Sequence, residues 1–188
     1  LGAALGVQAK IVLPGIFGDN MVLQQQTEAQ FWGKAAPGKK VTIHPSWSTK
    51  AITANVDKDG RWKAAVPTPE AGGPYTIELS DGERLTLRNV LIGEVWLCSG
   101  QSNMEMPMRG FNNQPVEGSA DVIIRAKAST PIRLCTVNRS TARSPQEECT
   151  AQWQENTPEA VAGTSATAYY FAQYLQNVLD VPVGVIVT

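Results

Sequence analysis

The feature that most constrains the fold of this sequence is a ten-residue segment, 89–98, that is apolar almost throughout and runs directly into small polar residues. It reads Asn-Val-Leu-Ile-Gly-Glu-Val-Trp-Leu-Cys, and Ser-Gly-Gln-Ser-Asn follows it. A strand with apolar side chains on both faces is typical of a parallel sheet covered by helices. We therefore expect a strand buried on both faces here, with Trp96 in the core and Cys98 as a buried thiol.

The rest of the chain after residue 90 fits the same α/β layer. Segments 132–137 and 183–187 predict two more buried strands, and helices are expected near 121–128 and over 165–179. The second helix has apolar residues at steps of three and four, which predicts one buried face: Ala168, Phe171, Ala172, Leu175, Val178 and Leu179. The order strand, helix, strand, helix, strand implies right-handed parallel crossovers. The stretch between residues 138 and 158 reads as a polar loop.

Residues 10–90 have a different pattern, typical of an all-β unit. Short segments rich in β-branched and aromatic residues recur about every ten residues between turn signals such as Pro37-Gly38 and Asp81-Gly82, a spacing that predicts a β-sandwich. The predicted strands are 28–32, 40–44, 49–56, 61–66, 75–79 and 83–88. The predicted organisation is a signal-peptide remnant or disordered segment over 1–9, a β-sandwich domain over 10–90, and an incomplete α/β domain over 91–188.

Composition narrows the function classes. Of the 188 residues 43% are hydrophobic and 18% are charged, with a net charge of −1, which is typical of a globular chain without a basic surface. We expect neither nucleic acid nor membrane as a partner. Residues 1–9 are small, apolar and uncharged and end in Val7-Gln8-Ala9. They resemble the end of a signal peptide, which predicts a secreted or periplasmic protein, although an ordinary frayed N-terminus reads the same way.

Histidine and cysteine limit the available chemistry. His44 is the only histidine and the three cysteines lack metal-ligand spacing, so we expect no metal and no cofactor. Cys135 and Cys149 could form a disulfide in an oxidising compartment. His44 lies in the β region, so we interpret it as a residue of the sandwich edge, not as a catalytic base.

The candidate site follows from the topology. In an open parallel sheet, functional residues gather at the carboxyl ends of the strands, which here are Ser99–Met104, Asn138-Arg139 and Thr188. Gly100 permits a sharp turn after the first strand, and Ser102 would present its hydroxyl beyond it. This pattern suits a nucleophilic serine with backbone N–H groups for an oxyanion, but also a phosphate-binding or purely structural loop.

A family resemblance favours the nucleophile. Ser99-Gly-Gln-Ser-Asn-Met104 resembles the nucleophile block of the sialate O-acetylesterase family, carbohydrate esterases of the SGNH hydrolase superfamily. Two stretches agree in order and spacing: Val12–Gln24 with the family's opening segment, and Ser165–Tyr169 with Val181–Val185 before its second block. The resemblance implies the first half of a parallel-sheet, flavodoxin-like hydrolase domain that cleaves sugar O-acetyl esters. It implies that Ser102 attacks the ester and that its backbone N–H helps to bind the oxyanion.

The same resemblance implies missing parts. The family's glycine and asparagine oxyanion donors and its Asp-x-x-His pair cannot be placed on this sequence. We therefore expect a second polypeptide, or a C-terminal continuation, to complete the α/β domain and cover an open edge of its sheet. The substrate class would be O-acetylated carbohydrate, with sialic acid and xylan both open; a lipase-like or peptidase relative would differ in the acyl substrate.

Other residues are weaker candidates. Gln101 and Asn103 flank the serine and could orient substrate or simply form the turn. Glu105 and Arg109 could contact sugar hydroxyls, although solvated loop charge is the commoner role. Three tryptophans could stack on sugar rings or pack in the core: Trp47, Trp62 and Trp153. The alternative function is a non-catalytic carbohydrate-binding or structural module in which the β-sandwich does the binding.

Overall fold

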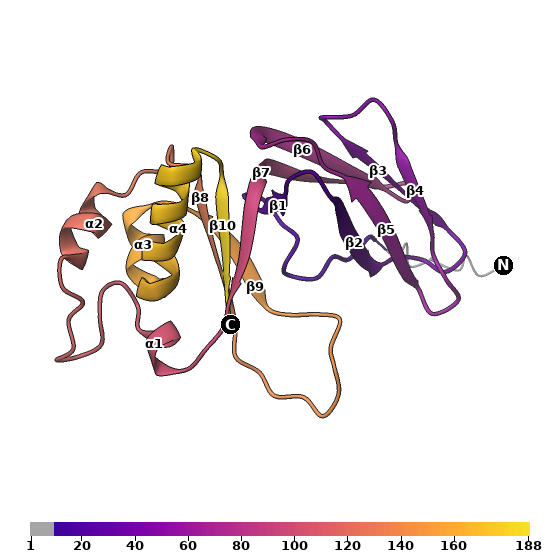
Figure 1. The fold of residues 1–188 in the computed structure, drawn as a ribbon. Helices are drawn as coiled ribbons and strands as arrows, with labels where there is room; N and C mark the ends of the chain where they lie inside the picture. The colour runs from indigo at the N-terminus through magenta and orange to yellow at the C-terminus, as the bar shows by residue number, and fades with distance from the viewer. Residues whose placement is uncertain (1–9) are drawn as a thin grey trace.

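A computed structural model describes residues 10–188; the predicted signal-peptide remnant, 1–9, lies outside the described residues. Within them, no helix is both long and apolar enough to cross a membrane. The elements in chain order (Figure 1) are β1 (Val22–Gln24), β2 (Glu28–Lys34), β3 (Lys40–Pro45), β4 (Ile52–Asn55), β5 (Arg61–Pro67), β6 (Gly72–Ser80), β7 (Arg84–Cys98), α1 (Ser102–Glu105), α2 (Ser119–Arg125), β8 (Ile132–Val137), β9 (Ala151–Glu155), α3 (Pro158–Gly163), α4 (Ala166–Leu179) and β10 (Val183–Val187).

Strand β7 joins the two halves of the molecule. It forms one 15-residue strand where the sequence predicts two, over 83–88 and 89–98. Its first part pairs antiparallel with β6 and its last five residues pair parallel with β10, so one mixed sheet runs in the order β4-β3-β6-β7-β10-β8-β9. The predicted boundary at residue 90 therefore falls inside a continuous strand. The division into two domains stays a prediction.

The parallel strands of the α/β half agree with the sequence prediction. β7, β10 and β8 are parallel, and β10 lies between the other two. β9 was not predicted, because the sequence around it reads as a polar loop. It pairs antiparallel with β8. Among its side chains Trp153 is buried, whereas Gln152 and Gln154 face solvent, so the segment lacks the apolar run that would predict a strand.

The six predicted strands of residues 10–90 are present, as β2 to β6 and the start of β7. β2 and β5 form a separate two-stranded antiparallel sheet, and their inward side chains share one core with the main sheet. Phe31 and Trp62 from the small sheet belong to the same buried cluster as Val41 and Ile77 from the large one. Whether this half is a β-sandwich in the strict sense stays a prediction.

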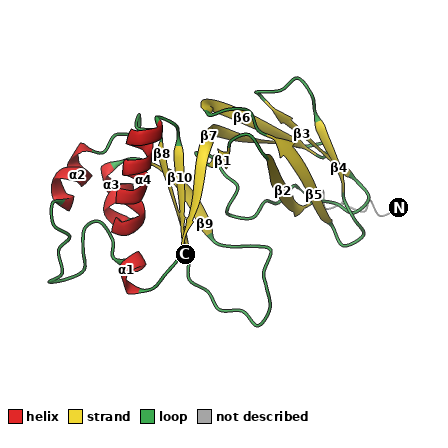
Figure 2. Cartoon of the chain, viewed as in Figure 1, coloured by secondary structure: helices red, strands yellow, loops and turns green. Residues whose placement is uncertain are grey.

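The two faces of the parallel sheet have different cover. One face packs against the helices, which all gather on that side (Figure 2), and its core includes Leu134, Val185 and Tyr169. On the other face, Cys135 and Trp153 belong to the buried core of the N-terminal half. The sheet is thus the middle layer between a helical layer and the N-terminal β-structure.

Helix α4 lies close to its predicted range and is capped at both ends. The Ser165 hydroxyl accepts a hydrogen bond from the N–H of Ala168 at 3.3 Å, and Asp180 ends the helix with a left-handed φ of 52°. α2 lies over Ser119–Arg125 instead of 121–128. α3 was missed, although Thr157 caps it and Pro158 occupies its first turn, which is a recognisable start signal.

One prediction about burial is wrong. The segment 89–98 is not buried on both faces to its end, because Trp96 is 43% exposed and Leu97 is 69% exposed. The predicted apolar face of α4 is likewise buried only in part, since Ala168 and Ala172 are in the core but Phe171, Val178 and Leu179 are exposed. Among the described residues, the partners of β7 on the side away from β10 end at Gly93, so no strand lies beside Val95–Cys98 on that side.

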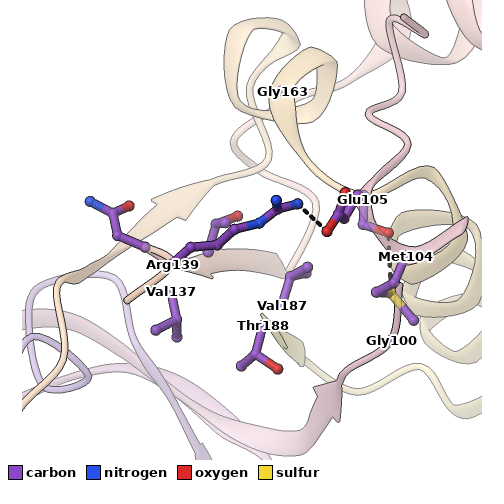
Figure 3. Close-up of a pocket in the computed structure, with 11 residues that line it drawn as sticks. Gly100, Met104, Glu105, Val137, Arg139, Gly163, Val187 and Thr188 are labelled. Carbon is purple, nitrogen blue, oxygen red and sulfur yellow. Dashed lines mark hydrogen bonds and ion pairs between the residues drawn. The ribbon is translucent and has the colours of Figure 1, made fainter. Parts of the chain in front are cut away.

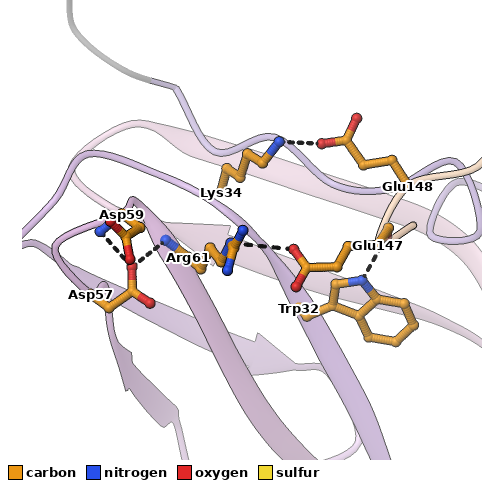
Figure 4. Close-up of polar contacts among 7 residues, drawn as sticks. All are labelled: Trp32, Lys34, Asp57, Asp59, Arg61, Glu147 and Glu148. Atoms are coloured by element: carbon orange, nitrogen blue, oxygen red, sulfur yellow. Dashed lines mark hydrogen bonds and ion pairs between the residues drawn. The ribbon is translucent and has the colours of Figure 1, made fainter. Parts of the chain in front are cut away.

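The loop between β8 and β9 reaches back across the sheet to the N-terminal half (Figure 4). The Trp32 indole donates to the backbone oxygen of Glu147 at 3.1 Å, Lys34 pairs with Glu148 at 2.5 Å, and Arg61 pairs with Glu147 at 3.4 Å. These side chains are more than half exposed in both ion pairs, so each pair contributes little stability. Together they fix the path of a long polar loop.

Candidate active site

The carboxyl ends of the three parallel strands meet in one pocket, as the topology predicts. The pocket has a volume of about 380 Å³ and is lined by Gly100 after β7, by Asn138 and Arg139 after β8, and by Thr188 after β10. Glu105 and Ser165 line it from the helical side. Residues from all three strand ends therefore surround one cavity large enough for a small ligand, and its polar side chains come from the β8 end, the β10 end and the helical side.

Ser102 is the first residue of α1, directly beyond the end of β7, and its side chain is exposed. It lies on the turn that forms one wall of the pocket, between the lining residues Gly100 and Met104. The first N–H groups of a helix have no partner within it, and the first such bond here runs from Glu105 N–H to the carbonyl of Gln101. The N–H groups of Ser102 and Asn103 thus have no partner within α1.

The start of α4 holds this turn in place. The Ser165 hydroxyl lies 3.2 Å from the Met104 sulfur, the Thr167 hydroxyl donates to the carbonyl of Asn103 at 3.1 Å, and the Ala166 N–H donates to the carbonyl of Met106 at 2.8 Å. These contacts come from the first residues of a 14-residue helix packed on the sheet. A short four-residue helix is therefore fixed by a longer, rigid one.

Gly100 allows close packing and does not adopt an unusual backbone angle. It is absent from the glycines with positive φ, but a Cβ there would lie 3.0 Å from the Cβ of Met104. A contact this short is tighter than most contacts of a Cβ, so the Met104 side chain would have to shift slightly. The turn predicted from the sequence thus exists, and its glycine lets α1 fold back closely against the strand end.

An ion pair spans the pocket. Glu105, at the end of α1, pairs with Arg139, which extends from the loop after β8 (Figure 3). The two side chains are 41% and 75% exposed, so their free donors and acceptors remain open to solvent. The sequence singles out Asn138-Arg139 only as a strand end, and the pairing with Glu105 depends on the fold.

The other predicted site residues lie around the same turn. Gln101 and Asn103 are exposed on either side of Ser102. Arg109 is exposed farther along the loop, where its N–H donates to the carbonyl of Ala162 at 3.1 Å. It is not among the residues that line the pocket.

His44 lies in the N-terminal half of the chain and does not line this pocket. It is an exposed residue of β3 and stands opposite Glu78 on β6. Figure 1 shows β3 at the opposite side of the molecule from α1. The imidazole is thus on another element than the one that carries Ser102. β3 is not an edge strand, because it lies between β4 and β6 in the sheet, so the interpretation of His44 as a residue of the sandwich edge is not supported.

Two of the three tryptophans that could stack on sugar rings are buried, and the third is half-buried. Trp62 and Trp153 are each 3% exposed and belong to the core. Trp47 is half-buried, donates to the Pro67 carbonyl at 2.9 Å and packs edge-on against Tyr75. These positions weaken the alternative of a binding module built on those rings.

Cysteines and acidic residues form no special centre in residues 10–188. Cys98, Cys135 and Cys149 are free thiols, so the structure does not contain the bridge considered between the last two. Burial, and secondarily the neighbouring Cys149, raises the pKa of the Cys135 thiol to about 12; burial also raises the pKa of Cys98. No group of three or more potential metal ligands occurs among the described residues.

The fold matches that of a solved carbohydrate esterase. A solved carbohydrate acetylesterase from Xanthomonas citri superposes on this chain with a TM-score of 0.86 and 31% sequence identity, covering 94% of this chain and 40% of that protein. Identity at this level over almost the whole chain indicates common descent with a carbohydrate acetylesterase. No family model matches the chain.

Sequence relatives narrow the class to one family. Sialate O-acetylesterases of Pongo abelii and Homo sapiens are 30% identical over 186 residues, and that of Mus musculus is 27% identical over 184. The matches cover 88–89% of this chain. The resemblance to the sialate O-acetylesterase family is thereby confirmed. The chain spans about a third of the length of these relatives, 33–35%.

Proposed function

We propose that this chain carries the nucleophile of a carbohydrate O-acetylesterase, and that Ser102 is that nucleophile. The observation that supports it is the position of Ser102: an exposed hydroxyl at the end of a strand, beside a polar pocket formed by three strand ends. The relatives named as sialate O-acetylesterases and the carbohydrate acetylesterase neighbour support the substrate class.

The proposed reaction is acyl transfer through a covalent intermediate. The Ser102 oxygen bonds to the acetyl carbonyl carbon while a base takes its proton, and the sugar oxygen then leaves and receives that proton. Water next attacks the acetyl-serine and releases acetate. The unpartnered N–H groups at the start of α1 are suited to bind the oxyanion that forms in each step.

The base has to come from outside these residues. His44 is the only histidine of the chain and lies on β3, whereas a serine needs a base within hydrogen-bond reach, about 3 Å. We propose that a continuation of the chain or a second polypeptide supplies the base and further oxyanion donors. The span of a third of the relatives' length is consistent with this.

The lining of the pocket suggests how sugar would be held. Glu105 and Arg139 offer acceptors and donors side by side, which suits neighbouring hydroxyl groups of a saccharide. Asn138 and Thr188 add neutral polar groups on the strand side. We assign this wall to the sugar and the α1 turn to the acetyl group.

Replacing the nucleophile tests the proposal. In the complete protein, Ser102→Ala should lower hydrolysis of an aryl acetate by about four to six orders of magnitude, because the covalent route is lost. Its thermal midpoint should change little, since the side chain is exposed. His44→Gln is the matched control and should stay within a few-fold of wild type. Near wild-type turnover by Ser102→Ala would exclude the serine as nucleophile.

A further inference from the structure

The structure assigns Thr167, on the first turn of α4, as a positioning residue for the proposed nucleophile Ser102. Its hydroxyl holds the short helix that begins at Ser102, and so fixes the direction in which the serine faces the pocket. Thr167 itself is not among the residues that line the pocket, so it would act only through α1. This inference rests on the proposal that Ser102 attacks the ester, and it names a residue on which the rate of that attack depends.

The carbonyl of Asn103 has no partner in its own helix. Inside a helix each carbonyl accepts from the N–H four residues further on. For Asn103 that residue is Pro107, which has no N–H. α1 is only four residues long, and two backbone bonds between residues four apart hold it, donated by Glu105 and Met106. The Asn103 carbonyl therefore needs a donor from another element or from water.

Thr167 supplies that donor. Its hydroxyl donates to the Asn103 carbonyl at 3.1 Å, between residues 64 positions apart in sequence. The neighbouring Ala166 N–H donates to the carbonyl of Met106 at 2.8 Å. The end of α1 is thus attached to the start of α4 at two consecutive residues, and only the Thr167 bond is made by a side chain. That bond can be removed without changing the backbone.

The surroundings of Thr167 leave its hydrogen bond as its main contribution. The side chain is exposed, whereas Ala166 and Ala168 on either side of it are buried. Threonine is also a poorer helix former than alanine, because its branched Cβ restricts the side chain. Removal of the hydroxyl would leave no cavity and no buried polar group, so it should change the geometry of α1 more than the stability of the fold.

The position of α1 determines how often Ser102 is ready to react. A helix of this length does not stay formed by itself, because isolated helices shorter than about 12–15 residues are marginal in water. A nucleophile misplaced by about 1 Å can lose roughly a hundredfold in rate. We therefore expect loss of one exposed hydrogen bond to lower the fraction of correctly placed serine, and with it the rate, by about three- to tenfold.

Substitutions at Thr167 test this role in the complete protein. Thr167→Val removes the hydroxyl and keeps the shape of the side chain. The kcat for an aryl acetate should fall about three- to tenfold and KM should stay within about twofold, because formation and hydrolysis of the acetyl-serine use the same turn. Thr167→Ser retains a hydroxyl and should restore most of the rate. Equal losses in the valine and serine variants would overturn the role of the hydrogen bond.

Thr164 offers a matched control on the segment just before α4. Its hydroxyl is buried and has no partner among residues 10–188. Its backbone is extended, with φ −82° and ψ 162°, which valine adopts readily. Thr164→Val makes the same chemical change without removing a hydrogen bond, and it should leave kcat unchanged. A loss as large as that of Thr167→Val would mean that both act through general packing, which would overturn the proposal.

Hydrogen exchange separates this inference from the proposed function. The Glu105 amide donates to the Gln101 carbonyl at 3.0 Å and reports whether α1 is held. In Thr167→Val it should exchange at least about threefold faster than in wild type, with no change at Ala172 in the middle of α4. Faster exchange at Glu105 with unchanged kcat would overturn the positioning role and leave Ser102 as nucleophile; unchanged exchange would overturn the attachment itself. Turnover retained by Ser102→Ala would overturn the proposed function, and this role with it, whatever the exchange at Glu105 shows.

Discussion

The most informative test of the packing concerns a buried arginine between the two halves. Arg133 on β8 has a side chain that is 5% exposed, and its guanidinium lies 3.5 Å from Glu155 on β9. One Nη donates to the Ile132 carbonyl at 3.2 Å, while Nε has no partner. Glu155 also accepts from Asn89 on β7 at 2.9 Å. We predict that Glu155→Gln destabilises the protein more than Arg133→Met does.

The expected magnitudes follow from burial. Removing one partner of a fully buried ion pair costs about 3–5 kcal/mol, because the other charge stays buried and uncompensated. The Glu155 side chain is 38% exposed, so water can replace part of the carboxylate; we expect about 1–3 kcal/mol for Glu155→Gln. Arg133→Met removes the buried charge and the unpartnered Nε together, and should cost less than about 1 kcal/mol.

Thermal unfolding of the complete protein ranks the variants by their stability. The double variant Arg133→Met/Glu155→Gln should unfold close to Arg133→Met alone, because no buried charge is left to compensate. If Arg133→Met is the more damaging single change, the ion pair stabilises the junction by itself and the reasoning from desolvation is wrong.

Two further predictions concern the pocket wall and the thiols. In the complete protein, Arg139→Gln should raise the KM for an acetylated sugar by about tenfold and leave aryl acetate turnover unchanged; equal losses on both substrates would contradict a sugar-contacting role. For the thiols, burial raises the Cys135 pKa from an ordinary 9.0 to about 12. The thiol therefore ionises first in the unfolded state, and the folded state loses stability relative to it as the pH rises from 9.0 towards 12. At pH 9 an alkylating reagent should modify half-buried Cys149 before Cys135 in the native protein; mass spectrometry showing Cys135 modified first would refute this.

The sequence predicts the elements that have strong local patterns. The apolar runs of β7, β8 and β10 and the 3.6-residue period of α4 each indicate their structure directly, and the parallel order of the strands follows from the helices between them. β9 and α3 lack a long apolar run, so they are visible only through pairing and capping. The exposure of Trp96 and Phe171 could not be predicted either, because an apolar residue looks the same in the sequence whether the fold buries it or leaves it exposed.

The site was predictable to a similar extent. The gathering of strand ends follows from topology, and the position of Ser102 follows from the polar turn after an apolar strand. The ion pair between Glu105 and Arg139 was not predictable, because it joins the end of α1 to the loop after β8, 34 positions apart in sequence, and only the fold brings them together. Local sequence thus indicates where a site lies, while the contacts across it depend on the fold.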